Sequence, residues 1–148
     1  MLRLLATLVT ALAVSPPLVQ PLKVAATPQG ALLVADSGAG RIIRIDTRTR
    51  VPTVVAAHLP RLESVTTSPA GVVYAISNER LYRIVAGRPQ LVWTSTGDAG
   101  PTDCAVAVRR LGAVTGVAVA RGAVYATLAE GGVKVARIPA NGSVTRIA

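Results

Sequence analysis

The chain has 148 residues, 51% hydrophobic and 16% charged, which excludes intrinsic disorder and allows one domain with a substantial core. The single cysteine, Cys104, excludes an internal disulfide and a cysteine-based metal cluster. We attribute the net charge of +9 to composition, because the basic residues are scattered along the chain. No aromatic residues lie among them to stack bases, so we expect no specific nucleic-acid partner. A weak preference for anionic ligands is the alternative.

The N-terminus has the three-part plan of a secretory signal. Arg3 precedes the apolar stretch 4–14, and small residues and prolines follow it. The prolines interrupt a run that would need about 20 apolar residues to span a membrane. We predict residues 1–21 as a signal peptide with a Pro-rich lead-in, so that the mature chain begins between Ala13 and Pro21. The protein is then secreted or periplasmic, and a membrane anchor or an N-terminal strand are the alternatives.

From residue 22 onward, short apolar runs are interrupted by Gly, Pro, Asn and Ser, and no window shows helical spacing. Val, Ile, Leu and Tyr dominate these runs and favour strands, so we predict an all-β chain. Three units repeat, each with a glycine, a strand, a turn, a strand that ends in Arg-Ile and a last strand. They cover residues 22–57, 62–94 and 114–148, with an insertion around 95–112. Units of about 40–50 residues with four short strands are typical of propeller blades.

The first unit resembles a known repeat family. Residues 30–46 (GALLVADSGAGRIIRID) are similar to the NHL repeat, and the stretch 97–103 resembles the Gly/Asp-rich insertion between NHL blades. The Asp36 position holds Ser77 in the second unit and Leu128 in the third. The resemblance implies a partial β-propeller of three four-stranded antiparallel blades. It also implies a family used mostly for binding, with related propellers among lactonases, lyases and strictosidine synthase-like enzymes.

The number of blades raises the question of closure. Closed propellers have about 4–8 blades, so three blades leave one apolar face uncovered at each end. A homodimer that completes a six-bladed ring would cover both faces. Further blades in a longer propeller would do the same, and an open wedge is the third alternative.

Antiparallel strands place the turn between the second and third strands of a blade on the same face as the link to the next blade. Connecting loops on a rigid scaffold commonly carry binding sites, so we expect a protein or a small anionic ligand to bind there. Asn78 and Glu130 lie on this face. The candidate binding residues on it are Asp36, Arg41, His58, Glu79, Arg80, Asp98 and Asp103.

Structural roles compete with binding at several of these positions. Asp36 could instead accept backbone N–H groups within its own tight turn. His58 has no partners at a spacing that suits catalysis or a metal. Asp98 and Asp103 are too few to hold Ca²⁺, which takes 6–8 oxygen ligands. We therefore predict no catalytic residue, no metal site and no cofactor.

No phosphate-binding loop, nucleophile elbow or metal-spaced His/Cys set is present in the sequence. Together with the family resemblance, this favours an extracytoplasmic binding module over an enzyme. The alternatives are a part of a propeller enzyme of lactonase or lyase type, and a truncated propeller without a ligand of its own.

Overall fold

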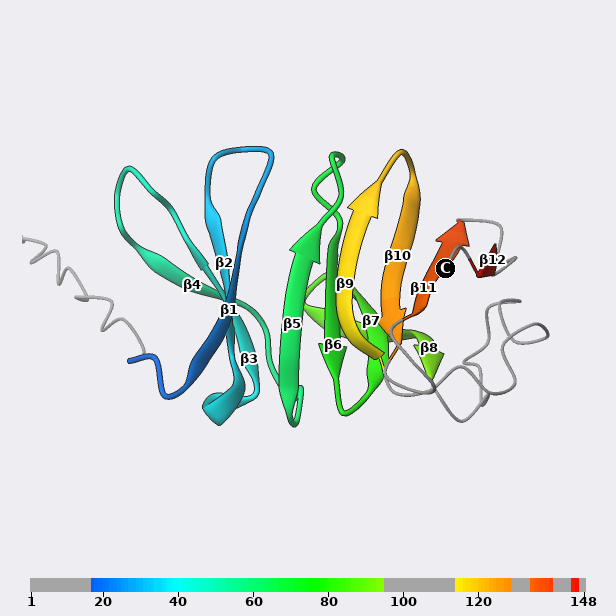
Figure 1. The fold of residues 1–148 in the computed structure, drawn as a ribbon. Helices are drawn as coiled ribbons and strands as arrows, with labels where there is room; N and C mark the ends of the chain where they lie inside the picture. Colours follow the sequence, from blue (N-terminus) through cyan, green and yellow to red (C-terminus); the bar gives the residue numbers. More distant parts are fainter. Residues whose placement is uncertain (1–16, 95–113, 129–133, 140–144, 147–148) are drawn as a thin grey trace, which may run out of the picture.

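The computed structural model describes residues 17–94, 114–128, 134–139 and 145–146 (Figure 1). Within these residues all regular structure is strand, apart from one short 3₁₀ helix, η1, at Ser37–Ala39. The predicted all-β fold class is confirmed. None of the described residues belongs to a helix long and apolar enough to cross a membrane.

The strands form three antiparallel four-stranded sheets. The first contains β1 (Pro21–Ala26), β2 (Leu32–Asp36), β3 (Arg41–Ile45) and β4 (Pro52–Ala56). The second contains β5 (Leu62–Thr67), β6 (Val73–Ser77), β7 (Arg80–Val85) and β8 (Arg88–Thr94). The third contains β9 (Val114–Ala120), β10 (Ala123–Leu128), β11 (Lys134–Pro139) and β12 (Thr145–Arg146). In each sheet the strands follow one another in chain order.

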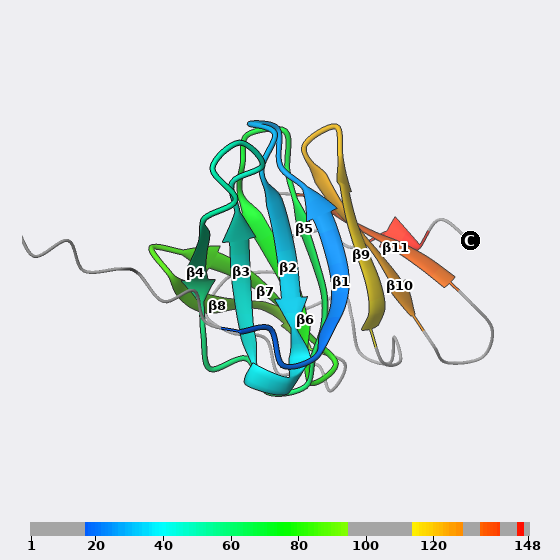
Figure 2. The same ribbon diagram turned by 90° about the vertical axis from the view of Figure 1, so that its left-hand side faces the viewer.

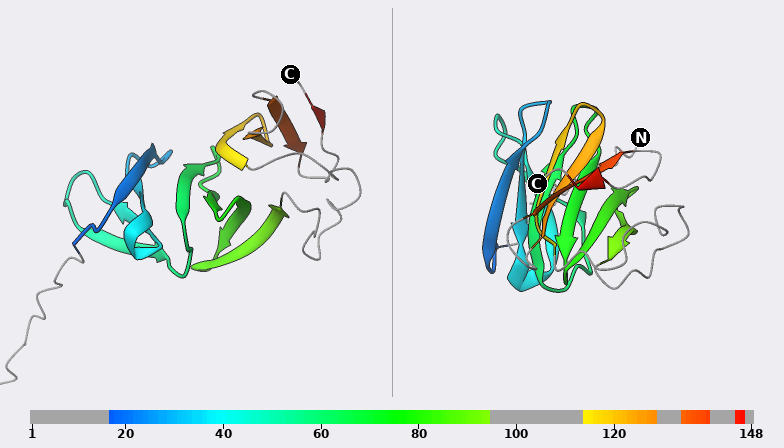
Figure 3. Two further views of the ribbon diagram at one scale, coloured as in Figure 1. Left: turned by 60° about the horizontal axis from the view of Figure 1, so that its bottom comes forward. Right: turned by 45° about the vertical axis from the view of Figure 1, so that its right-hand side comes forward.

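The three sheets stand one behind another like blades. Figure 1 shows them side by side, Figure 2 looks onto the first sheet with the others behind it, and Figure 3 shows them fanning apart. The first strands of consecutive sheets contact each other, β1 with β5 and β5 with β9. The first strand of each sheet therefore lies on the inner side of the fan, as in a propeller.

Successive side chains of a strand point to opposite faces of its sheet, so a sheet can pack against a neighbour on each face. Two apolar clusters between the sheets form in this way. The cluster between the first and second sheets contains Leu33, Ala35, Ile42, Ala56, Leu59, Leu62, Val65 and Ala75. The cluster between the second and third sheets contains Ile76, Leu81, Val114, Val124, Ala126 and Ile138. Within the described part of the chain, another sheet therefore covers both faces of the middle sheet and one face of each end sheet.

The face of the first sheet that points away from the second sheet is apolar. Val24, Val34, Ile43 and Val54 lie opposite one another across its four strands and share this face, which we call the front face. Val24 and Val54 on the two outer strands are 61% and 50% exposed, whereas Val34 and Ile43 on the two middle strands are buried, at 4% and 0%. This agrees with the apolar end expected from an incomplete set of blades.

The other end of the stack differs from that expectation. The outward positions of β9 and β10 include Gly116, Ala118, Tyr125 and Thr127, which are small or polar as well as apolar. Thr127 also accepts or donates a side-chain hydrogen bond with Thr115 at 3.1 Å. The two end faces are therefore unlike in chemistry, and the front face is the more hydrophobic of the two.

Candidate functional site

Backbone hydrogen bonds connect three loops at one end of the stack, the lower end in Figure 1. The N–H of Leu59 donates to the carbonyl of Gly40 at 2.9 Å, and the N–H of Asn78 donates to the carbonyl of Arg61 at 3.2 Å. The Ser77 hydroxyl donates to the Pro60 carbonyl. These bonds place the turn 37–40, the link 57–61 and the turn 78–79 together, and we call this end the loop face.

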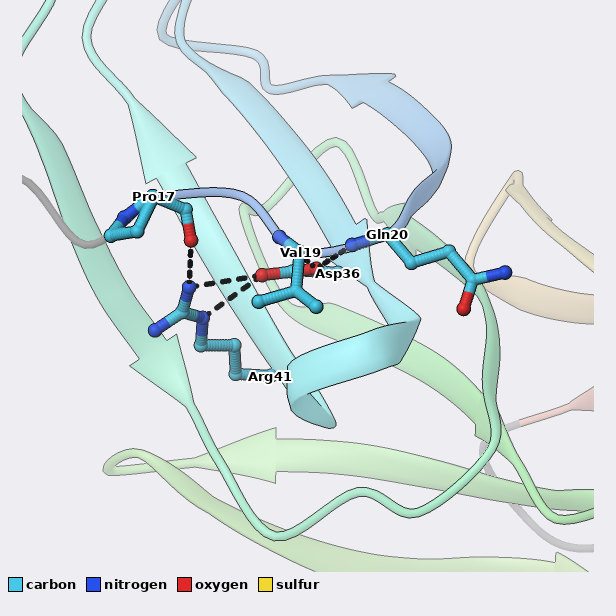
Figure 4. A network of polar contacts seen from close by, with 5 residues as sticks. All are labelled: Pro17, Val19, Gln20, Asp36 and Arg41. Carbon is cyan, nitrogen blue, oxygen red and sulfur yellow. Dashed lines mark hydrogen bonds and ion pairs between the residues drawn. The ribbon is translucent and has the colours of Figure 1, made fainter.

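Asp36 lies at the end of β2 with no exposed surface, under the segment 17–20 (Figure 4). Its Oδ1 accepts the backbone N–H groups of Gln20 at 2.8 Å and Val19 at 3.1 Å. Its Oδ2 accepts the Nε–H of Arg41 and is paired with Arg41 Nη2, both at 3.0 Å. Arg41 Nη2 also donates to the Pro17 carbonyl at 2.6 Å. The carboxylate therefore holds the segment that precedes β1.

This arrangement differs from the hairpin role considered for Asp36, because its partners lie 16 and 17 residues earlier in the chain and η1 receives no side-chain cap. Burial raises the pKa of Asp36, but hydrogen bonds from Gln20, Arg41 and Val19 outweigh it and leave the pKa below its ordinary value. Asp36 and Arg41 therefore occupy the loop face as a neutralised pair.

The remaining described candidates are exposed on the loop face. They are His58 in the link and Glu79 and Arg80 at the turn between β6 and β7. Arg61 is exposed in the same link and was missed by sequence reasoning, because no motif marks an isolated basic residue in a loop. Asp98, Asp103 and Glu130 lie outside the described residues. Among the residues that are described, no three metal-ligating side chains gather.

The turn at 78–79 carries unusual backbone strain for its type. Three two-residue hairpins have positive φ at both central residues, as type I′ turns require. Two of them have glycine in the second position, Gly87 and Gly122. In the third, Glu79 occupies that position with a φ of 62°. Because residues in this region cost of order 1–3 kcal/mol unless they are glycine, the exposed carboxylate is kept at a cost in stability.

We expect Glu79→Gly to raise the free energy of unfolding by roughly 1 kcal/mol, because relief of the strain exceeds the entropy that glycine adds to the unfolded chain. Chemical denaturation of the two proteins measures it. Ala86→Gly is the comparison variant: Ala86 has a φ of 48° in the hairpin at the opposite end, so this substitution relieves strain of the same kind and should raise the stability as well. Equal or lower stability of Glu79→Gly would contradict the assignment of strain to Glu79.

A groove of about 550 Å³ lies at the opposite end of the stack, between the first two sheets. Val55 of β4 lines one side, and the turns 70–73 and 83–87 line the other. No sequence signal could have located it, because it depends on how two sheets diverge. The predicted binding residues do not line it.

Comparison with known proteins identifies the fold. No protein-family model matches this chain, and no curated protein matches it. A virginiamycin B lyase from Staphylococcus aureus is 18% identical, with a TM-score of 0.63 over 89% of this chain and 42% of its own. A gluconolactonase from Xanthomonas campestris is 17% identical, with a TM-score of 0.64 over 87% of this chain and 47% of its own.

A PQQ-bound aldose sugar dehydrogenase from Streptomyces coelicolor is 24% identical, with a TM-score of 0.57 over 87% of this chain and 47% of its own. The lyase and the gluconolactonase are β-propellers, so the fold of this chain is that of a partial β-propeller. The chain spans less than half the length of each of these three structures.

Proposed function

We propose that this partial β-propeller is an extracytoplasmic binding module of NHL type whose loop face contacts a protein or a small anionic ligand. The observation that carries the proposal is the strained Glu79 in a hairpin turn that holds the exposed Arg80 and is hydrogen-bonded, through Asn78, to the link that holds the exposed Arg61. Strained backbone persists where the surrounding structure holds it, and it clusters at functional sites.

The charges of the loop face favour an anionic group. Leu62 lies opposite Ser77, and Ser77 lies opposite Arg80, so Arg61 and Arg80 flank the same hairpin. Arg41 is neutralised by Asp36, so among the described residues of the loop face the exposed guanidinium groups are those of Arg61 and Arg80. A guanidinium binds a carboxylate with two parallel hydrogen bonds, and an acidic side chain of a protein partner supplies that group.

The double variant Arg61→Gln and Arg80→Gln tests this assignment. With an Asp/Glu-rich hexapeptide as the probe, we expect the affinity to fall by about tenfold, because two solvent-exposed ion pairs of about 0.5–1 kcal/mol each are lost. Backbone NMR shifts on titration measure it. Arg48→Gln in the turn 46–50, at the opposite end, is the matched control and leaves the affinity unchanged. Equal affinity of the double variant and this control contradicts the proposal.

A second candidate function is a propeller enzyme, which the similarity to a lyase and a gluconolactonase favours. It predicts hydrolysis of a simple aldonolactone in the presence of an added divalent metal, and loss of that activity in His58→Ala and Glu79→Ala. The binding proposal predicts hydrolysis at the uncatalysed rate for all three proteins. A pH-stat assay separates the two functions.

The extracytoplasmic location is a proposal that rests on the apolar stretch 4–14. If the chain is processed, its new N-terminus should lie between Ala13 and Pro17, because the Pro17 carbonyl and the N–H groups of Val19 and Gln20 bind Arg41 and Asp36. Mass spectrometry of protein from the exported fraction checks this. An intact Met1 in a soluble fraction, or an N-terminus after Gln20, would contradict it.

A further inference from the structure

The front face of the first sheet repeats the face by which the second sheet packs on the first. Val24 and Val65 each precede the repeat glycine by the same spacing, as Val34 and Ala75 each follow it. Val65 and Ala75 lie in the cluster between the first two sheets. Val24, in contrast, is 61% exposed. The front face therefore has the side chains of a blade-to-blade interface without a covering blade among the described residues. Its outer-strand valines, Val24 and Val54, are exposed, whereas Val34 and Ile43 between them are buried.

The segment before β1 has the same relation to its sheet as the link between the first two sheets. The N–H of Ser37 donates to the Gln20 carbonyl at 2.8 Å, as the N–H of Asn78 donates to the Arg61 carbonyl at 3.2 Å. Leu18 thus occupies the position of Leu59, two residues before the bonded carbonyl. Leu59 is 1% exposed and Leu18 is 42% exposed. Leu59 packs against the preceding sheet, and Leu18 is positioned to do the same.

The surface that should cover the front face follows from the two interfaces already formed. The second and third sheets each pack against three side chains of the preceding sheet. Two of these side chains lie on the second strand of that sheet and one lies on its third strand. Toward the second sheet these positions are Leu33, Ala35 and Ile42. Toward the third sheet they are Tyr74, Ile76 and Leu81. On the outer side of the third sheet, which we call the back face, they are Tyr125, Thr127 and Val135.

We propose that the front face of the first sheet packs on the back face of the third sheet of a second copy of this chain. Applied twice about a two-fold axis, this contact is self-complementary and closes six blades, within the range of about 4–8 found in closed propellers. The size fits, because the chain spans 42% of the S. aureus lyase and 47% of the X. campestris gluconolactonase. Tyr125 on the back face is the repeat equivalent of Tyr74, which packs against the cluster between the second and third sheets. It would make the same aromatic contact with the front face of the second copy.

Sedimentation of the whole chain tests the contact. We expect a dimer of twice the 15.2 kDa chain mass. Val24→Asp on the front face and Tyr125→Asp on the back face should each weaken the dimer by about 30-fold or more, the cost of a central interface residue. Val85→Asp is the matched control, because Val85 is an exposed valine on the second sheet. Circular dichroism verifies that each variant is folded, and Tyr125→Ala replaces Tyr125→Asp if the latter unfolds.

Mixing the two variants identifies the pairing. A mixture of Val24→Asp and Tyr125→Asp retains one intact front-to-back contact, so it should associate more tightly than either variant alone. A monomeric parent chain at high micromolar concentration would overturn the proposal. A Tyr125 variant that dimerises as tightly as the parent chain would also overturn it, since it would indicate pairing of two front faces.

Discussion

Asp36→Ala is expected to lower the free energy of unfolding by about 2 kcal/mol, because it removes a buried charged acceptor that three donors share. The carboxylate accepts the N–H groups of Val19 and Gln20 and the guanidinium of Arg41, and it has no exposed surface. Its loss releases the segment 17–20 and uncovers the end of β2. Urea denaturation at a fixed protein concentration measures the change.

Asp36→Asn provides the control for charge. The asparagine keeps an oxygen for the N–H groups of Val19 and Gln20 but can present an amide N–H to Arg41. Its free energy of unfolding should therefore lie between those of the parent chain and Asp36→Ala. Removal of residues 1–20 should also lower the stability, since it removes the N–H groups of Val19 and Gln20 while the Asp36–Arg41 pair remains. A stability of Asp36→Ala equal to that of the parent chain would show that the segment contributes nothing.

The pH dependence of the unfolding free energy provides a second test of the contribution of Asp36. The pKa of Asp36 is lowered on folding from its ordinary value of 3.8. A group with a lower pKa in the folded state stabilises the fold above its unfolded pKa and loses that contribution as the pH falls through the folded value. The difference in unfolding free energy between the parent chain and Asp36→Asn should therefore be constant from pH 7 to about 5 and shrink below pH 4.

The strands could be predicted from the sequence because they depend on local patterns. The repeat glycines and the Arg-Ile strands are periodic, and each hairpin joins strands that are adjacent in the chain, so their antiparallel pairing follows. The partners of Asp36 could not be predicted, because they are backbone groups and backbone groups carry no sequence pattern. The same reason explains why the segment 17–20 was predicted as a lead-in outside the blades.

The candidate site was predictable in its location but not in its composition. Strand direction alone places the turns 37–40 and 78–79 at one end, and the hydrogen bonds to the link 57–61 connect them there. Which side chains are free to bind depends on tertiary pairing. Arg41 is bound by Asp36, whereas Arg61 is exposed, and neither fact follows from spacing in the sequence.

Leu59→Ala should produce the largest loss, about 3 kcal/mol of unfolding free energy, because it removes a fully buried side chain from the cluster between the first two sheets. Leu59 also positions the loop face, since its N–H donates to Gly40. The backbone of Gly40 approaches the link so closely that a Cβ would lie 3.1 Å from the Leu59 carbonyl oxygen. We therefore expect weaker binding at the loop face as well as lower stability, measured by urea denaturation and peptide titration.

Leu18→Ala is the matched control, because it removes the same atoms from the equivalent position of the preceding link, where the side chain is 42% exposed. At concentrations where the chain is monomeric, its effect on unfolding should stay within about 0.5 kcal/mol, as for most surface positions. At concentrations where the dimer forms, the same substitution should weaken association, because Leu18 would then be as buried as Leu59. If Leu18→Ala and Leu59→Ala destabilise the monomer equally, Leu18 already has a covering surface within one chain, and the open front face is not the reason for association.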